Sequence, residues 1–226
     1  MFFPERIISI ASSDRVLEVG PGSNPHHRSD VLLEKKFETQ QEYEAQFGHE
    51  EKLISDKKIV FYEGDKFPFS DNEFDYVICS HVLEHVEDPE LFLNEIFRVA
   101  RKGYFEYPLI YYDYLYNFNV HLNFLKFDGK TLYYKKKSDT SLNEFLPIQS
   151  FFYESLKMGH VKLINDLLPF MMEGFEWHHP FETRKAVTVD ELVLKNFSVP
   201  APPVTPERSA SALQLLKQLL KKTIKG

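Results

Sequence analysis

Arg15-Val16-Leu17-Glu18-Val19-Gly20-Pro21-Gly22 is the stretch that decides the fold. Its apolar residues predict a short buried strand over 15–20, and the glycines predict a tight turn directly after that strand. Glycine at such a turn lets the backbone approach a ligand where a Cβ would collide. The stretch therefore predicts a strand whose carboxyl end meets a binding site.

Further apolar segments downstream have the length and composition of strands. They are residues 30–34, 59–62, 74–80 and 104–107. Asp88-Pro89 opens a predicted helix that runs to about Arg101, with apolar residues at helical spacing. Because strands and helices alternate over short connections, the sequence predicts an α/β fold with a parallel sheet covered on both faces.

The pattern is looser after Pro108. We expect late strands near 131–134 and 183–194, and helical structure over 144–172. The expected organisation is one domain over 1–197 with insertions at about 108–180, a proline-rich linker over 198–208, and a C-terminal helix over 209–226.

Polar residues follow the predicted strands at the points where the strands end. Glu34 closes the second strand, where a carboxylate can accept hydrogen bonds from both ribose hydroxyls. Asp65 follows the third strand, where an acid can accept from an exocyclic adenine amine, and Ser80 and His81 follow the fourth. Since the carboxyl ends of parallel strands share one edge of a sheet, these residues predict a nucleoside site.

Three motifs in this order resemble the class I S-adenosylmethionine-dependent methyltransferases over about residues 14–110. They are Val16 to Gly22, Gly64-Asp65 with Phe67 to Asp75, and His81 to Pro89. The resemblance implies a Rossmann-like methyltransferase fold with a mostly parallel seven-stranded sheet and helices on both faces. It also implies S-adenosylmethionine as the cofactor.

In that family the glycine loop and the acid at Glu18 hold the methionine end, residues like Glu34 bind the ribose, and residues like Asp65 bind the adenine. The cofactor-binding set that the resemblance implies is Glu18, Gly20, Gly22, Asn24, Glu34, Lys35, Asp65, Lys66, Ser80 and His81. One departure is Asn24, which replaces the third glycine of the loop. The other is the short distance from the loop to Glu34, about a dozen residues, for which we expect a short turn or one helical turn.

Three histidines are candidate general bases: His81, His85 and His121. A base is needed only if the acceptor must lose a proton, because positioning of the acceptor against the activated sulfonium supplies most of the acceleration. His81 is the first choice because it is nearest to the end of the fourth strand; packing or capping is the alternative role for each histidine. The spacing His81-x-x-Glu84-His85 loosely resembles the Glu-x-x-Glu-His metal site of some RNA 2′-O-methyltransferases, but the first ligand differs, and we expect no metal.

Residues 104–127 contain ten aromatic side chains. Tyrosines suit a sugar ring or an aromatic acceptor, although core packing is the alternative that we favour for more than half of them. The segments Asn24-Pro25, Gly103 to Pro108 and Phe127 to Leu132 are similar to bacterial methyltransferases, some associated with surface-glycan synthesis.

Composition indicates which binding partners and which cellular compartment to expect. The formal net charge is −7, which disfavours nucleic acid as the default partner. The single cysteine excludes an internal disulfide, and no signal peptide or apolar run of membrane-spanning length is visible, so we expect a cytoplasmic protein. Leu213 to Ile224 predicts a basic amphipathic helix that docks on the body, on a second subunit, or on an anionic membrane.

These observations predict a cytoplasmic methyltransferase that acts on a small molecule or glycan, at oxygen. One alternative is a non-catalytic protein that keeps the fold and binds the cofactor or a partner. Another is an RNA or protein methyltransferase, which would need a basic groove beside the site. The intact set of Glu18, Gly20, Gly22 and Asp65 favours an enzyme.

Overall fold

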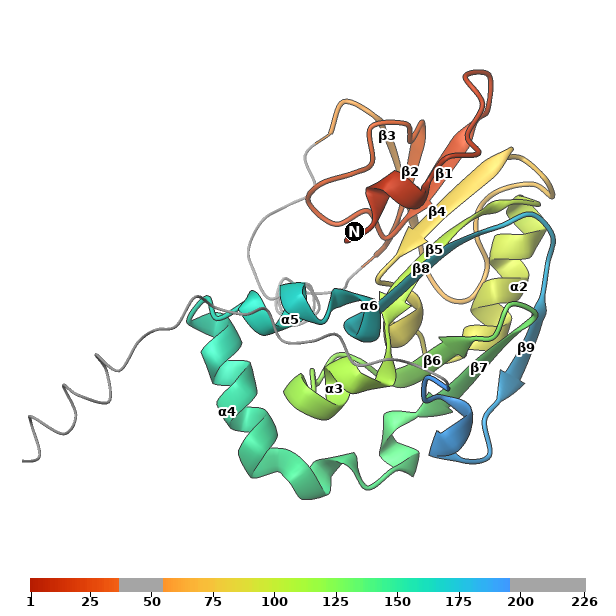
Figure 1. Ribbon diagram of the computed structural model, residues 1–226. Coiled ribbons are helices and arrows are strands. Elements are labelled where there is room, and N and C mark those ends of the chain that lie inside the picture. The colour runs from red at the N-terminus through yellow and green to blue at the C-terminus, as the bar shows by residue number, and fades with distance from the viewer. Residues whose placement is uncertain (37–54, 196–226) are drawn as a thin grey trace, which may run out of the picture. The chain divides into compact units, whose positions relative to one another are not determined.

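A computed structural model describes residues 1–36 and 55–195 of the chain (Figure 1). The chain divides into two units, Met1–Val193 and Leu194–Gly226, and every described helix and strand belongs to the first. The predicted linker over 198–208 and the predicted helix over 209–226 lie outside the described residues.

The first unit is built on a six-stranded sheet in the order β3-β2-β1-β4-β5-β8 (Figure 1). The strands are β1 (Val16–Val19), β2 (Val31–Lys35), β3 (Lys58–Tyr62), β4 (Tyr76–Ser80), β5 (Gly103–Pro108) and β8 (Met172–Trp177). The first five are parallel, and β8 is antiparallel to β5. The fold is the predicted Rossmann-like methyltransferase fold, but the described sheet has six strands rather than seven.

The centre of the sheet is fully buried, as a central parallel pair requires. All four residues of β1 are buried, and in β4 the run from Tyr76 to Cys79 is at most 1% exposed. Gly103 lets β5 approach β4, because a Cβ there would lie 2.3 Å from the carbonyl oxygen of Val77. Strand order reverses between β1 and β4, which makes their carboxyl ends the topological switch point, where ligands bind in such sheets.

Helix α2 (Pro89–Val99) covers part of the sheet (Figure 1). Asp88 caps it: its side chain accepts hydrogen bonds from the backbone N–H groups of Glu90 and Leu91. The helix buries the face that carries Phe92, Leu93, Ile96 and Val99. The prediction of a helix from Asp88-Pro89 is therefore confirmed, with an end two residues before Arg101.

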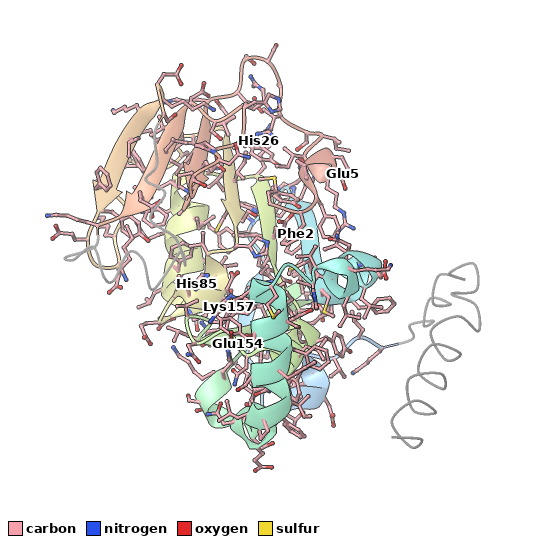
Figure 2. All side chains as sticks on the ribbon, turned by 90° about the vertical axis from the view of Figure 1, so that its left-hand side faces the viewer. Phe2, Glu5, His26, His85, Glu154 and Lys157 are labelled. Carbon is pink, nitrogen blue, oxygen red and sulfur yellow. The ribbon has the colours of Figure 1, made fainter. Side chains whose placement is uncertain are left out.

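Among the described residues, a second, three-stranded sheet and four helices follow β5, in the part of the chain where the sequence pattern is looser. The sheet has the order β6-β7-β9, with β6 (Asn123–Phe127), β7 (Thr131–Lys136) and β9 (Glu182–Lys185). The helices are α3 (Ile110–Tyr116), α4 (Leu146–Lys157), α5 (Lys162–Asp166) and α6 (Leu168–Met171). Figure 2 shows α4 toward the viewer, with Glu154 and Lys157 on it.

Two predictions for this part need correction. The helical stretch over 144–172 is three helices, because Gly159 at φ +86° ends the first and a proline begins the last. The strand predicted over 183–194 ends at Lys185, and the chain then forms a 3-10 turn, η5 (Val189–Glu191), closed by a capping box from Thr188. Within residues 1–36 and 55–195, no helix is both long and apolar enough to cross a membrane.

Candidate active site

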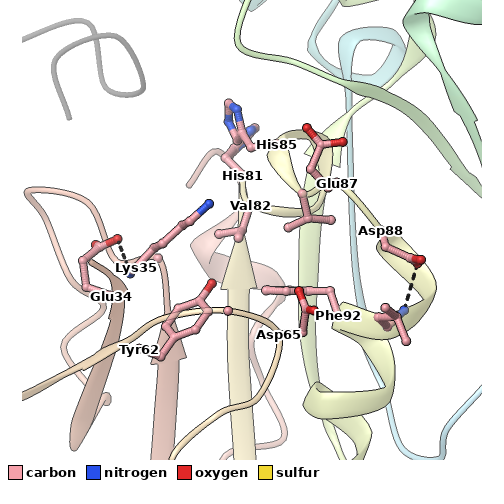
Figure 3. A pocket seen from close by; sticks show the side chains of 14 residues that line it. Glu34, Lys35, Tyr62, Asp65, His81, Val82, His85, Glu87, Asp88 and Phe92 are labelled. Carbon is pink, nitrogen blue, oxygen red and sulfur yellow. Dashed lines mark hydrogen bonds between the residues drawn. The ribbon is translucent and has the colours of Figure 1, made fainter. Parts of the chain in front are cut away.

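A pocket of about 300 Å³ lies at the carboxyl ends of the parallel strands (Figure 3). This volume is at the lower end of small-molecule sites. Six of the residues predicted for the site line it: Gly20, Glu34, Lys35, Asp65, His81 and His85. The wall also includes the apolar side chains of Val82, Leu91 and Phe92, to which the sequence analysis assigned no role in binding.

Gly20 fixes the close approach of the loops after β1 and β4. Its φ is +62°, in the region that L side chains rarely adopt, and a Cβ would lie 2.5 Å from Cγ2 of Val82. Glycine is therefore required both by backbone conformation and by space. The backbone of Gly20 thus forms part of the pocket lining.

Two carboxylates reach the pocket from neighbouring strand ends. Glu34 ends the buried part of β2, and its Oε1 accepts a hydrogen bond from the Lys35 N–H at 3.0 Å. Burial raises the pKa of Glu34 to about 7, and the single backbone hydrogen bond only partly offsets that rise. Asp65 is exposed and follows Gly64, whose φ is +70°. In the view of Figure 3 the Tyr62 ring lies between the two acids.

Glu18 is held beneath the loop after β1 instead of lining the pocket. Its Oε2 accepts from the His26 N–H at 2.8 Å and from the Ser29 hydroxyl at 2.6 Å. Burial, the largest influence, raises its pKa. Glu18 thus fixes the β1–β2 connection, which contains no helix, in agreement with the expected short turn. Gly22, Asn24, Lys66 and Ser80 are also outside the set that lines the pocket.

His81 is placed between two buried carboxylates. Nδ1 lies 3.1 Å from Oε1 of Glu84, and Nε2 lies 3.0 Å from Oε1 of Glu106. Burial alone would lower the pKa of His81, but the two carboxylates outweigh it and raise the pKa to about 9. Both ring nitrogens are occupied, so the geometry favours an ion-pair bridge over the role of free base.

Glu106 is the centre of this polar cluster, and sequence reasoning missed it. Besides His81 it accepts hydrogen bonds from the Tyr104 hydroxyl at 2.7 Å and from the backbone N–H groups of Phe2 and Phe3. These donors, with His81, outweigh burial and hold its pKa well below the usual range. The available signal was a lone acid inside the apolar strand predicted over 104–107.

His85 and His121 approach each other from different segments. The ring centroids are 4.9 Å apart, with planes at 78°. Nδ1 of His85 lies 2.9 Å from the Val120 carbonyl oxygen, and Nδ1 of His121 lies 2.9 Å from Oδ2 of Asp113. His85 lines the pocket, whereas His121 is buried and is not among the residues that line it.

The aromatic segment over residues 104–127, which begins in β5, contributes half of its rings to the core. Five of its ten rings are fully buried, and the other five are half-buried. The buried ones are Tyr104, Phe105, Tyr107, Tyr116 and Phe124. Core packing, the alternative stated for these residues, therefore accounts for half of them.

The sheet order, with the pocket at its switch point, is that of a Rossmann-like methyltransferase fold. A family model described as a methyltransferase domain matches residues 36–105, which include β3, β4, α2 and the start of β5. The matched residues include the motifs at Asp65 and at His81 to Pro89.

Two curated proteins are similar over short stretches. An uncharacterised protein of Methanocaldococcus jannaschii is 37% identical over 46 residues, 20% of this chain and 22% of that protein. Ajmaline N-methyltransferase of Rauvolfia serpentina is 40% identical over 50 residues, 21% of this chain and 17% of that protein. The alignments thus span about a fifth of these relatives.

Solved structures are similar over about half of either chain. A methyltransferase of Thermotoga maritima aligns with 18% identity and a TM-score of 0.32 over 47% of this chain and 49% of that one. A methyltransferase of Mesorhizobium loti aligns with 14% identity and a TM-score of 0.34 over 56% and 58%.

Proposed function

We propose that the protein transfers a methyl group from S-adenosylmethionine to an oxygen of a small-molecule or glycan acceptor. The observation that carries the proposal is the convergence of Gly20, Glu34, Asp65 and His81 on one pocket at the β1/β4 switch point. A nucleoside cofactor needs this combination of bare backbone and carboxylate acceptors.

The residues present fit the cofactor. Glu34 offers carboxylate oxygens for the ribose hydroxyls, Asp65 offers them for the adenine amine, and Phe92 offers an apolar surface. The cofactor, when bound, supplies a methyl group on a positively charged sulfur.

The rim of the pocket supports a small or neutral acceptor rather than RNA. Its exposed acids are Asp65, Glu87 and Asp88, against one exposed lysine, Lys35. Phosphate binding needs an excess of positive charge, which this rim lacks. A lipid-linked glycan would be a suitable acceptor if the predicted C-terminal helix binds a membrane. That helix and the cytoplasmic location stay predictions from sequence.

Calorimetric titration with S-adenosylmethionine and S-adenosylhomocysteine tests the cofactor site. We expect Glu34→Gln and Asp65→Ala each to weaken binding by about tenfold or more, because each removes a charged hydrogen-bond acceptor. Glu154→Gln is the matched control, since it makes the same chemical change as Glu34→Gln on the exposed face of α4, where Glu154 pairs with Lys157. Equal affinities for all four proteins would contradict the assignment of the pocket.

Turnover tests the activity. Release of S-adenosylhomocysteine is measured with panels of sugars, small phenols and alcohols, RNA and protein. We expect release with a hydroxyl acceptor and none with RNA. Cofactor binding without turnover on any panel would favour the alternative of a non-catalytic cofactor-binding protein.

A further inference from the structure

Glu84, His85 and His121 place their ligand atoms within 4.8 Å of one another beside the pocket. Two of them belong to the turn η2 (Leu83–His85), and the third precedes β6. We infer that this cluster binds a first-row divalent transition-metal cation, which in turn binds an oxygen of the acceptor. The cation site stands on the cluster itself, whereas the role toward the acceptor rests on the proposed function.

Within the described part of the chain, the Glu84 carboxylate has one oxygen without a hydrogen-bond partner, and its other oxygen lies 3.9 Å from Nε2 of His85. The Glu84 side chain is fully buried, Oε1 accepts from His81, and Oε2 has no hydrogen-bond partner among the described residues. A buried carboxylate oxygen without a partner is costly, and most buried polar atoms in proteins are paired. A cation at the cluster would supply the missing partner.

The two histidines are oriented as metal ligands are. The carbonyl oxygen of Val120 can only accept, so Nδ1 of His85 carries the hydrogen and Nε2 keeps its lone pair. The Asp113 carboxylate orients His121 in the same way. Such hydrogen bonds from the second ring nitrogen to a carbonyl or carboxylate accompany metal-bound histidines almost invariably.

The groups behind the ligands are themselves fixed. Asp113 also accepts from Nζ of Lys137 at 2.9 Å and from the Phe118 N–H at 3.1 Å. The Leu122 N–H donates to the Glu84 carbonyl oxygen at 2.6 Å, which ties the segment carrying His121 to the turn carrying the other two ligands. The ligands are therefore preorganised, which reduces the entropy lost when a cation binds.

The donor set indicates the class of cation. Two imidazole nitrogens and one carboxylate oxygen suit Zn²⁺, Co²⁺ or Mn²⁺, whereas Mg²⁺ and Ca²⁺ prefer oxygen ligands throughout. Three protein ligands leave coordination positions open, as in catalytic sites. Since His85 lines the pocket, a cation on its Nε2 would lie at the edge of the pocket, where the hydroxyl of a sugar can complete the coordination.

A purely structural role is the competing explanation. The His121 ring stacks on Phe118, with centroids 5.1 Å apart, and its bond to Asp113 could serve only to fix the loop. That explanation predicts no metal binding, so the two are separated by direct titration.

The test uses the full chain, free of any affinity tag and stripped with a chelator, titrated with Co²⁺ by absorption spectroscopy and with Zn²⁺ by calorimetry. We expect one equivalent of either cation. His121→Gln should weaken binding by about tenfold or more, and Asp113→Asn, which touches only His121 among the ligands, should weaken it by about 10- to 100-fold. His179→Gln is the control, because His179 is exposed and outside the cluster.

Binding that is absent, or that His121→Gln and Asp113→Asn leave unchanged, overturns the inference. Circular dichroism shows whether the variants fold, and the milder Asp113→Asn keeps the test valid if His121→Gln does not. Titration of His121→Gln with S-adenosylmethionine keeps the two proposals apart, because His121 does not line the cofactor pocket. Loss of cation binding with cofactor binding intact supports the cation site whether or not turnover is found.

Discussion

Replacing Glu34 by glutamine should make the protein more stable at neutral and alkaline pH while weakening cofactor binding. Glu34 is 6% exposed, and among the described residues its side chain accepts one hydrogen bond, from the Lys35 N–H. Its pKa is raised from 4.5 to about 7, which corresponds to about 3 kcal/mol against the ionised form in the folded state. Glutamine removes that cost because it carries no charge to bury.

The sign of the pH dependence follows from the proton count. Between pH 4.5 and about 7 the unfolded chain has released the proton of Glu34 and the folded protein has kept it. The unfolded state then binds fewer protons, so the free energy of unfolding falls as pH rises. Glu34 should remove about 2.5 kcal/mol of stability between about pH 5 and about pH 8.

Urea unfolding of wild type and Glu34→Gln at about pH 5 and about pH 8 measures this effect as a difference of differences. We expect the variant to gain about 2.5 kcal/mol on wild type over that interval, and Glu154→Gln, an exposed acid, to gain almost nothing. A Glu34→Gln advantage that is the same at both pH values would refute the reasoning. Higher stability together with weaker cofactor affinity would identify Glu34 as a residue kept for binding.

Three further substitutions test the geometry. Gly20→Ala should cost about 1–2 kcal/mol of stability from backbone strain, in addition to the cost of its collision with Val82, and should reduce cofactor affinity. Adding Val82→Ala to this variant should remove the collision but leave the backbone strain, and thermal unfolding of both variants measures the difference. His81→Asn should cost about 3 kcal/mol in urea unfolding, because it removes the imidazolium that bridges two buried carboxylates, and a loss below about 1 kcal/mol would contradict the ion-pair bridge. Gly103→Ala should cost about 1–3 kcal/mol or prevent folding, because its Cβ meets the backbone of Val77, and an unchanged melting temperature would contradict the close approach of β5 to β4.

The sequence predicts the five parallel strands and helix α2 because each of them is specified by residues that are close together in the sequence. Each of β1 to β5 is a short apolar run followed by turn residues, and Asp88-Pro89 is a strong helix start. Parallel strand ends share an edge, so Glu34 and Asp65 could be placed in one pocket without coordinates. Glu18 could not, because its partners His26 and Ser29 depend on the path of the loop.

The remaining parts depend on contacts between distant segments. Strand β8 contains Gly174, which weakens its apolar pattern in the sequence. The reason for this glycine is visible only beside β5, where a Cβ at Gly174 would lie 2.3 Å from the Tyr104 hydroxyl. His121 joins Glu84 only through folding, since 36 residues separate them and no motif spacing links them. For this reason the sequence favours a site without a metal, while the assembled cluster points to one.

The single cysteine gives the protein a built-in reporter. Cys79 is 1% exposed on the central strand β4, and burial raises the pKa of its thiol, so a thiol reagent reaches it only when the sheet opens. Its labelling rate therefore measures opening of the strand that leads to His81 without any engineered probe. Slower labelling in the presence of a ligand would show how strongly occupancy of the pocket stabilises this one strand, rather than the molecule as a whole.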